Sequence, residues 1–522
     1  MAMGSTRRDL LMGAIGAIPA SLIFGTPRHA LAASSPGGEI PRTDGPGVRF
    51  EPHVLRARAR AMAERAFVAP DTRLPEGFDA LSYDQYRAIA FRAEETWLRD
   101  GPGPFRIEWM PRGFLYRDHL EFDAVEEAQS LRIEQTDRCF AFPADVPAPK
   151  DGATLGWSGF RAKAPINRPD VAEEFVVFQG ASYFRAVGRG NVYGASARGL
   201  AIATADPKGE EFPLFREFWI EKPKADANLL VVHALLDGPS VTGAYRISIV
   251  PGETTTTTVE AALYPRVDLD RVGLGALTSM FLFAPNDRKG FDDFRPTVRD
   301  SEGLAFLTAS GEHCWRPLSN PETLQLSAFA DPDMRGFGLM QRQRSFFDYQ
   351  DMEAAYEKRP SAWVEPLGAW GDGSVVLVEI PTKEEIHDNI VAFWRPREPL
   401  HKGGEYLYSY RIHWGMDDPL RHDLARVVST LEGGDDDERL FIVDFVGPGL
   451  EAVKPQDLAA EVSSTPGTVV EPVIEPNPHT KGLRLAFRVK VGAEKLVEVR
   501  ARLKRGTDPM TETWLYRWTR SP

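Results

Sequence analysis

Residues 384–394, EEIHDNIVAFW, place acidic, imidazole and amide side chains directly before an apolar run. A carboxylic acid that donates a proton near neutral pH needs a raised pKa, which burial or a neighbouring anion provides. Asp388 has both in its sequence context, because Glu384 and Glu385 precede it and the apolar run 390–394 follows it. The chemistry that this suits is cleavage of a glycosidic bond, in which a carboxylic acid protonates the leaving oxygen and a carboxylate activates water or attacks the sugar.

The same segment has a purely structural explanation. Thr382 and Glu385 have the spacing of a capping box, so PTKEEIHD is also consistent with a one-turn helical connection. Its acidic residues would then only favour the positive N-terminus of that helix. Spacing alone leaves both interpretations of Asp388 open.

Composition and the absence of known motifs exclude several kinds of functional site. The sequence has no HExxH, Walker, GxSxG or CxxC pattern, and none of its 10 His residues is paired at ligand spacing, so we expect neither a metal nor another cofactor. A net charge of −13 argues against nucleic acid as a partner. What remains is a chain rich in carboxylates and aromatic rings, which suits a carbohydrate site, since flat rings cover the C–H faces of sugars.

The first 32 residues predict an export signal. Arg7 and Arg8 form a twin-arginine pattern ahead of an apolar stretch, and Ala30, Leu31 and Ala32 form an A-x-A cleavage site. We therefore expect cleavage near Ala32, a flexible leader over residues 33–47, and a mature protein in the periplasm.

Only two cysteines are present, Cys139 and Cys314, and both lie among aromatic residues. This context favours two buried thiols, with a single bridge between them as the alternative.

The elements that must position the acidic segment are mainly strands. From about residue 105, short runs rich in Val, Ile, Phe and Tyr recur between Gly, Pro and Asp, which excludes a doubly wound α/β fold and favours an antiparallel sandwich. Two helices are expected before them, over residues 55–66 and 86–97, the second opened by a capping box from Ser82 to Gln85.

A change in composition predicts two domains. Residues 395–405, RPREPLHKGGE, have the prolines, glycines and charges of an interdomain linker. We expect a large N-terminal β-sandwich over residues 48–396. The strand-like runs over residues 402–522 predict a smaller C-terminal sandwich of immunoglobulin-like size. An acidic run at 435–438 lacks the pattern of a calcium loop and is expected to be a solvated loop tip.

Nine stretches of the sequence form a set of motifs. One is VEIPTKEEIHDNIVAFW, which contains Asp388. The others, in order, are GASYFRAV at 180, YGASARGLAI at 193, EEFPLFREFW at 210, VTGAYR at 241, FRPTVRDSEGL at 294, RGFGLMQR at 335, YQDMEAAYEKRPSAWVEP at 349 and TETWLY at 511. Together they resemble the periplasmic osmoregulated-glucan biosynthesis family, OpgG and OpgD, formerly MdoG and MdoD. The likeness covers nearly all of the mature chain, and the twin-arginine leader is more similar to the D-type members.

The resemblance implies a mutarotase-like N-terminal sandwich with a long cleft for a β-1,2-linked glucan backbone, joined to an immunoglobulin-like domain. It implies an inverting endo-β-1,2-glucanase in which Asp388 is the general acid. Asp300 is the implied base, acting at a distance through water and a substrate hydroxyl. The matching motifs supply seven expected substrate contacts, each with packing or a structural ion pair as the alternative: Tyr356, Arg359, Trp363, Glu385, Asn389, Tyr183 and Arg185.

Three alternatives to hydrolysis stay open. Many family members carry a longer aromatic-bearing insertion where this chain has only the turn at Asp435, so a transglycosylase that closes β-1,2-glucan into a ring is one alternative. A non-catalytic scaffold that guides glucan chains from a membrane glucan synthase is another. A sugar epimerase of the mutarotase type rests on sandwich architecture alone, which is weak evidence of function. A homodimer is a further open expectation.

Overall fold

The computed structural model describes residues 48–150, 154–416, 419, 422–435, 437–450 and 453–520. The predicted signal at 1–32 and leader at 33–47 lie outside the described residues. Within the described part of the chain, the helices are all too short or too polar to cross a membrane.

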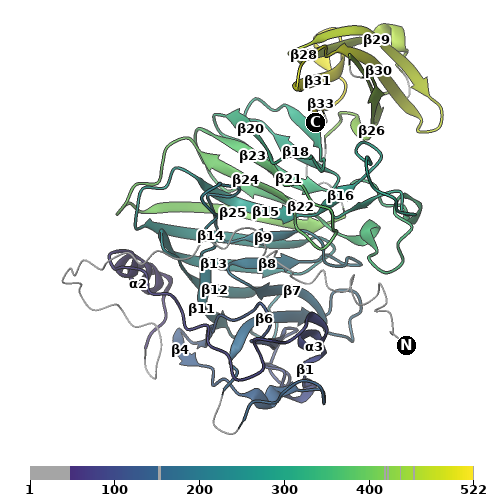
Figure 1. Ribbon diagram of the computed structural model, residues 1–522. Helices are drawn as coiled ribbons and strands as arrows, with labels where there is room; N and C mark the ends of the chain where they lie inside the picture. Colours follow the sequence, from purple (N-terminus) through teal and green to yellow (C-terminus); the bar gives the residue numbers. More distant parts are fainter. Residues whose placement is uncertain are drawn as a thin grey trace.

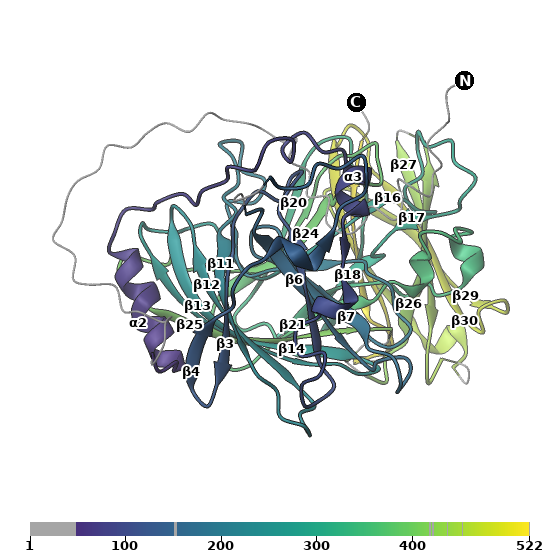
Figure 2. The ribbon, with the colours of Figure 1, turned by 90° about the horizontal axis from the view of Figure 1, so that it is seen from below.

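The fold is mainly β, as predicted, and is built on two large sheets that pack face to face (Figures 1 and 2). In the described residues, sheet I has ten strands. Its order is β2 (Arg106–Pro111), β6 (Trp157–Ala164), β7 (Glu173–Gln179), β8 (Tyr183–Ala186), β9 (Ser196–Arg198), β15 (Val272–Ser279), β24 (Ile390–Pro396), β23 (Gly373–Glu379) and β20 (Gln325–Asp331), with β10 (Ala201–Ile202) also on β15.

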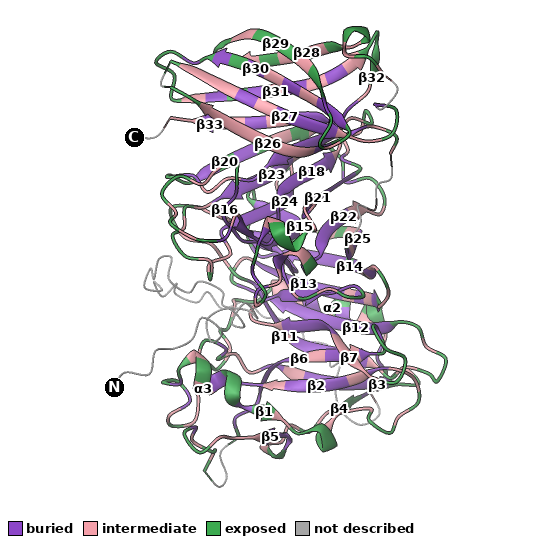
Figure 3. Ribbon diagram, turned by 90° about the vertical axis from the view of Figure 1, so that its right-hand side faces the viewer, coloured by how far each residue is buried: buried purple, intermediate pink, exposed green. Residues whose placement is uncertain are grey.

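Sheet II is longer, with fifteen strands in the described residues, and it extends into the C-terminal body. Its order is β28 (Ala459–Thr465), β31 (Leu496–Arg505), β33 (Thr513–Thr519), β19 (His313–Pro317), β18 (Gly303–Leu307), β21 (Gly336–Met340), β22 (Ser361–Pro366), β25 (Tyr406–Gly415), β14 (Thr255–Pro265), β13 (Val241–Val250), β12 (Leu230–Asp237), β11 (Leu214–Glu221), β3 (Glu121–Glu126) and β4 (Gln129–Arg132), with β32 (Asp508–Pro509) on β31. Buried residues run through both sheets, and the largest hydrophobic core fills the space between them (Figure 3).

The C-terminal body is a second, smaller sandwich. Sheet III consists of β26 (Arg426–Gly434), β27 (Glu438–Val446), β30 (Gly482–Lys490) and β29 (Thr468–Asn477). It faces the end of sheet II that β28, β31 and β33 form (Figures 1 and 3). Strands β19 and β33 run parallel and are paired at two residues each. This short pairing joins the C-terminal end of sheet II to the rest of the sheet.

The predicted linker at 395–405 does not mark the point where the chain leaves the large sandwich. Strand β25 begins just after it and pairs with both β14 and β22 inside sheet II. The boundary at 402 is therefore wrong in the structure, and the chain passes to the C-terminal body between Gly415 and Ala425. The prolines and glycines mark a turn between β24 and β25, which composition alone cannot distinguish from a linker.

The two predicted helices are present with different bounds: the first has the predicted length but begins three residues earlier, and the second is half as long and also begins three residues earlier. Helix α2 (Pro52–Ala63) buries Leu55 and Ala59 against the outer face of sheet II. Helix α3 (Tyr83–Ala88) begins with the predicted capping box, in which Ser82 and Gln85 each bind the other's backbone N–H. It ends at Ala88 because the next residues form β1 (Ala90–Phe91), which pairs with β5 (Phe140–Ala141).

Two other local predictions are confirmed. Cys139 and Cys314 are separate buried thiols. The acidic run lies at the turn between β26 and β27, where the Asp435 carboxylate accepts the backbone N–H groups of Asp437 and Glu438.

A buried ion pair connects the two bodies. Arg342, just after β21, donates two hydrogen bonds of 2.7 and 2.8 Å to the carboxylate of Glu512, just before β33. Nε2 of His422 lies 3.4 Å from the same carboxylate, and the His422 ring contacts that of His313 on β19. Burial raises the pKa of Glu512, but Arg342 and His422 outweigh it and lower that pKa to about 2. Glu512 is therefore ionised at neutral pH.

We expect His313 to make the junction sensitive to acid. Burial and the neighbouring His422 lower the pKa of the His313 imidazole from 6.5 to about 4. As the pH falls from about 6.5 to about 4, the unfolded chain binds a proton at His313 before the folded protein does, so stability falls over this window. Urea unfolding should show a larger loss between pH 7 and pH 4.5 for the wild type than for His313→Gln. Equal losses in the two proteins would contradict this role.

Candidate active site

The acidic segment connects β23 to β24 as a turn and not as a helix. Thr382 accepts the backbone N–H of Glu384 at 3.2 Å, as a helix cap would. The side chain of Glu385 does not complete the capping box, however. Its carboxylate lies 2.8 Å from the guanidinium of Arg295 and 3.3 Å from the hydroxyl of Tyr356. The capping-box interpretation of this pair is therefore wrong, because a long-range ion pair takes the glutamate.

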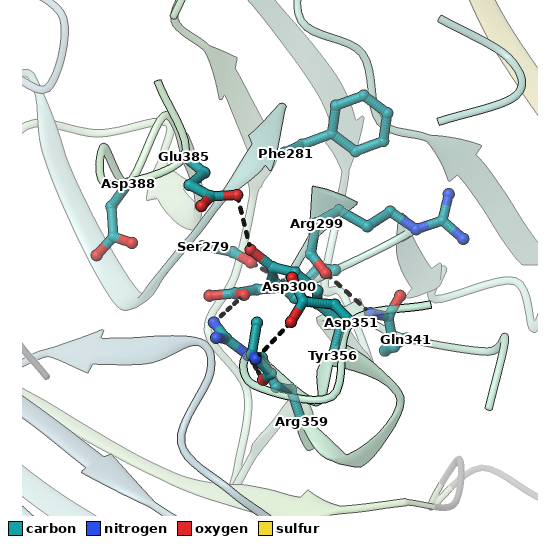
Figure 4. Close-up of polar contacts among 12 residues, drawn as sticks. Ser279, Phe281, Arg299, Asp300, Gln341, Asp351, Tyr356, Arg359, Glu385 and Asp388 are labelled. Atoms are coloured by element: carbon teal, nitrogen blue, oxygen red, sulfur yellow. Dashed lines mark hydrogen bonds and ion pairs between the residues drawn. The ribbon is translucent and has the colours of Figure 1, made fainter. Parts of the chain in front are cut away.

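Asp388 lies two residues before the start of β24, a strand in the interior of sheet I. Its side chain is 17% exposed, and its Oδ2 lies 3.5 Å from the guanidinium of Arg185. Arg185 lies on β8, which β9 separates from β15 in sheet I. The carboxyl group of Asp388 points away from the cluster around Asp300 (Figure 4). It is the more accessible of the two predicted catalytic carboxyl groups.

Asp300 follows β17 (Val298–Arg299), which pairs with β16 (Phe281–Phe283). Its side chain is only 5% exposed and is bound by the guanidinium of Arg359. Burial and the nearby charge of Asp388 raise the pKa of Asp300, while Arg359 and Arg185 oppose that rise. Asp300 and Asp388 are thus electrostatic neighbours, although they lie far apart in the sequence.

A short 3₁₀ turn, η5 (Tyr356–Lys358), brings Tyr356 and Arg359 to this centre. Ala355 before it has a left-handed backbone with φ 45°, a strained conformation for a residue with a Cβ. The Arg359 guanidinium stacks 4.4 Å from the Tyr356 ring. Gly194 leaves room for the Arg359 stem, since an added Cβ would lie only 2.9 Å from that side chain. Burial raises the pKa of Tyr356 well above 10, so its hydroxyl is a hydrogen-bond donor to Glu385.

Tyr183 and Arg185 both lie on β8, and the Arg185 guanidinium approaches the Asp388 carboxylate. Burial raises the pKa of Tyr183 to about 12, and the Arg198 guanidinium lies 5.0 Å from its ring. The same guanidinium lies 5.4 Å from the ring of Phe212, which is 44% exposed.

Sequence reasoning missed Arg198, Phe212 and Arg295 as candidates. All three lie inside quoted motifs, those that begin at residues 193, 210 and 294, so the family motifs could have pointed to them. No spacing rule singled them out, because their neighbours at the site come from other strands.

Two predicted substrate contacts have packing roles in the structure. Trp363 is 2% exposed, packs its indole on Gly336, and belongs to the hydrophobic core that joins sheet II to the C-terminal body. Asn389 is also 2% exposed, and its side-chain amide is hydrogen-bonded to the backbone of Phe281 and Ile380. Neither side chain presents a surface on which a sugar could bind in this conformation.

These contacts define a class of protein. It is a two-body β-sandwich protein whose polar centre combines an accessible aspartate with a buried, arginine-bound one, surrounded by arginines and tyrosines. Such a set can bond sugar hydroxyls and move protons between oxygen atoms.

The chain belongs to the periplasmic glucan biosynthesis family. The sequence profile described as "Periplasmic glucan biosynthesis protein, MdoG" matches residues 50–518. This membership places the protein in glucan biosynthesis.

Several relatives are named "Glucans biosynthesis protein G". One from Bradyrhizobium diazoefficiens is 46% identical over 98% of this chain and 99% of its own. One from Rhodopseudomonas palustris is 48% identical over 90% of this chain and 94% of its own. One from Vibrio cholerae is 49% identical over 90% of this chain and 87% of its own. These names carry the G designation, whereas the leader sequence had suggested a D-type member; the family itself is as predicted.

Proposed function

We propose that the protein acts in the periplasm on the β-1,2-glucan backbone, as an inverting endo-β-1,2-glucanase. The leading observation is the contrast between its two aspartates: the Asp388 side chain is 17% exposed, and that of Asp300 is 5% exposed and ion-paired with Arg359. In this proposal Asp388 donates a proton to the leaving glucosyl oxygen. Asp300 accepts the proton of the attacking water through a relay of water and a substrate hydroxyl.

The burial of Asp300 supports inversion over retention. A retaining glycosidase needs its second carboxylate in contact with the anomeric carbon, because it forms a covalent bond there. A buried carboxylate held by Arg359 is poorly placed for such an attack. It can still act through water, which an inverting reaction requires on the opposite face of the sugar.

Substrate contacts in this proposal fall on the polar side chains around Asp388, of which Glu385 is the most exposed, at 20%. Arg185 and Glu385 are polar groups for sugar hydroxyls, and Tyr183 and Tyr356 lie beside them. Phe212 is an exposed ring 5.4 Å from the Arg198 guanidinium and suits the apolar face of a glucosyl unit.

Incubation of the purified mature protein with linear β-1,2-glucan tests this function. We expect shorter chains and new reducing ends, and a glucan unchanged in both would contradict the proposal. A cyclising transglycosylase would instead give products one water lighter than the linear chain, without new reducing ends. A scaffold would bind the glucan without changing it. The twin-arginine leader supports export to the periplasm, which fractionation of cells that express the full chain would check.

A further inference from the structure

One short segment contacts both catalytic candidates. Ser279 ends β15 of sheet I and pairs with Ile390 of β24, the strand that follows Asp388. Phe281 begins β16 and pairs with Arg299 of β17, the residue before Asp300. Residues 279–282 therefore pass from the strand pair that carries one aspartate to the strand pair that carries the other.

Two asparagines fix the loop of Asp388 to this segment. Asn389 accepts the Phe281 N–H at 2.8 Å and donates to the carbonyl groups of Phe281 and Ile380 at 3.0 Å each. At the other end of the loop, Asn320 accepts the Thr382 N–H at 2.9 Å and donates to the carbonyl groups of Thr382 and Leu282. Both ends of the loop 381–389 are thus held by buried or partly buried amide groups.

Two further contacts fix Asp300 to the same segment. The Asp300 N–H donates to the carbonyl of Met280 at 2.8 Å. The hydroxyl groups of Ser279 and Ser301 lie 2.7 Å apart, and both serines are fully buried. Figure 4 shows Ser279 beside Asp300, with Phe281 on the neighbouring strand.

We infer that residues 279–282 are the spacer that sets the separation of the Asp388 and Asp300 carboxyl groups, with Asn389 and Ser279 as its positioning residues. This inference rests on the proposed function, in which the separation must leave room for a water and a substrate hydroxyl. Inverting and retaining glycosidases differ in this separation by only a few ångströms. Neither positioning residue touches the substrate; each acts on the place of a carboxyl group through buried hydrogen bonds.

Ser279→Ala and Asn389→Ala test the inference by steady-state kinetics on linear β-1,2-glucan. A displacement of about 1 Å at a reacting group can cost about 100-fold in rate, so we expect kcat to fall about 10- to 100-fold. KM and the Kd for glucan should change little, because the groups that bind sugar stay in place. Ser279 and Ser301 share one hydrogen bond, so the two substitutions remove the same interaction. The double variant Ser279→Ala/Ser301→Ala should therefore lose no more kcat than the slower of the two single variants.

The matched control is Ser130→Ala. Ser130 is a fully buried serine on β4, hydrogen-bonded to Asp123, at the far edge of sheet II. It should keep the wild-type kcat even if its unfolding temperature falls. Equal kcat losses in Ser130→Ala and Ser279→Ala would assign the effect to general destabilisation and overturn the inference.

The outcomes separate this inference from the proposed function. Turnover by the wild type together with full kcat in Ser279→Ala and Asn389→Ala would overturn the spacer alone. No turnover of linear β-1,2-glucan by the wild type would overturn the function and the spacer with it. Ser279→Ala loses only a hydroxyl and is expected to fold, so the test does not depend on Asn389→Ala being stable.

Discussion

Asp388→Asn is expected to lower kcat on linear β-1,2-glucan by about 100- to 10,000-fold, the usual contribution of a general acid. Asparagine keeps the size of aspartate but cannot donate an acidic proton to the leaving oxygen. KM should change little, because the amide still occupies the place beside Arg185, where the carboxylate lies 3.5 Å from the guanidinium. Reducing-end assays over a time course measure this directly.

Glu384→Gln is the matched control for Asp388→Asn. Glu384 lies in the same loop, but its side chain is 66% exposed and its nearest ionic partner is His387 at 3.6 Å. Its neutralisation should leave the rate close to that of the wild type. Ordinary turnover by Asp388→Asn would remove that residue from the role of acid.

Asp300→Asn is expected to have two separable effects. The rate should fall by about 100- to 10,000-fold if Asp300 is the base. The free energy of unfolding should also fall, because breaking a buried ion pair costs about 3–5 kcal/mol when one charge is left behind. That charge is the guanidinium of Arg359, which is also buried.

The double variant Asp300→Asn/Arg359→Gln separates the two effects. Removing both buried charges should restore part of the stability lost in Asp300→Asn, as measured by urea unfolding. The rate should not recover, because no carboxylate is present to accept the proton. Recovery of turnover together with stability would show that Asp300 serves only the fold.

Local sequence patterns predicted the parts of the fold that depend on near neighbours. The capping box of Ser82 and Gln85 formed because both of its hydrogen bonds lie within one turn. The strand-like runs became strands because their alternation of apolar side chains suits burial between two sheets. The same reasoning was wrong at Thr382 and Glu385, where Arg295, from a distant loop, binds the glutamate instead.

The candidate site itself is mainly a product of sheet topology. Asp388 meets Arg185 because β24 and β8 belong to one sheet, with β15 and β9 between them. The spacing of residues along the sequence does not indicate this order of strands in the sheet. Family resemblance singled out Asp300 and Asp388, which the fold makes electrostatic neighbours, but it could not show that Trp363 packs in a core and that Asn389 binds backbone. Strand β25 was misassigned for the same reason, since its partners β14 and β22 lie elsewhere in the chain.

The most direct test of the central claim is a proton NMR time course of the wild type with linear β-1,2-glucan. The method follows the configuration of each new reducing end as it forms. An inverting endo-glucanase converts a β-linkage into an α-anomer, so we predict that α-anomer signals appear first and that β-anomer signals follow by mutarotation. An unchanged glucan, or β-anomers as the first product, would contradict the account.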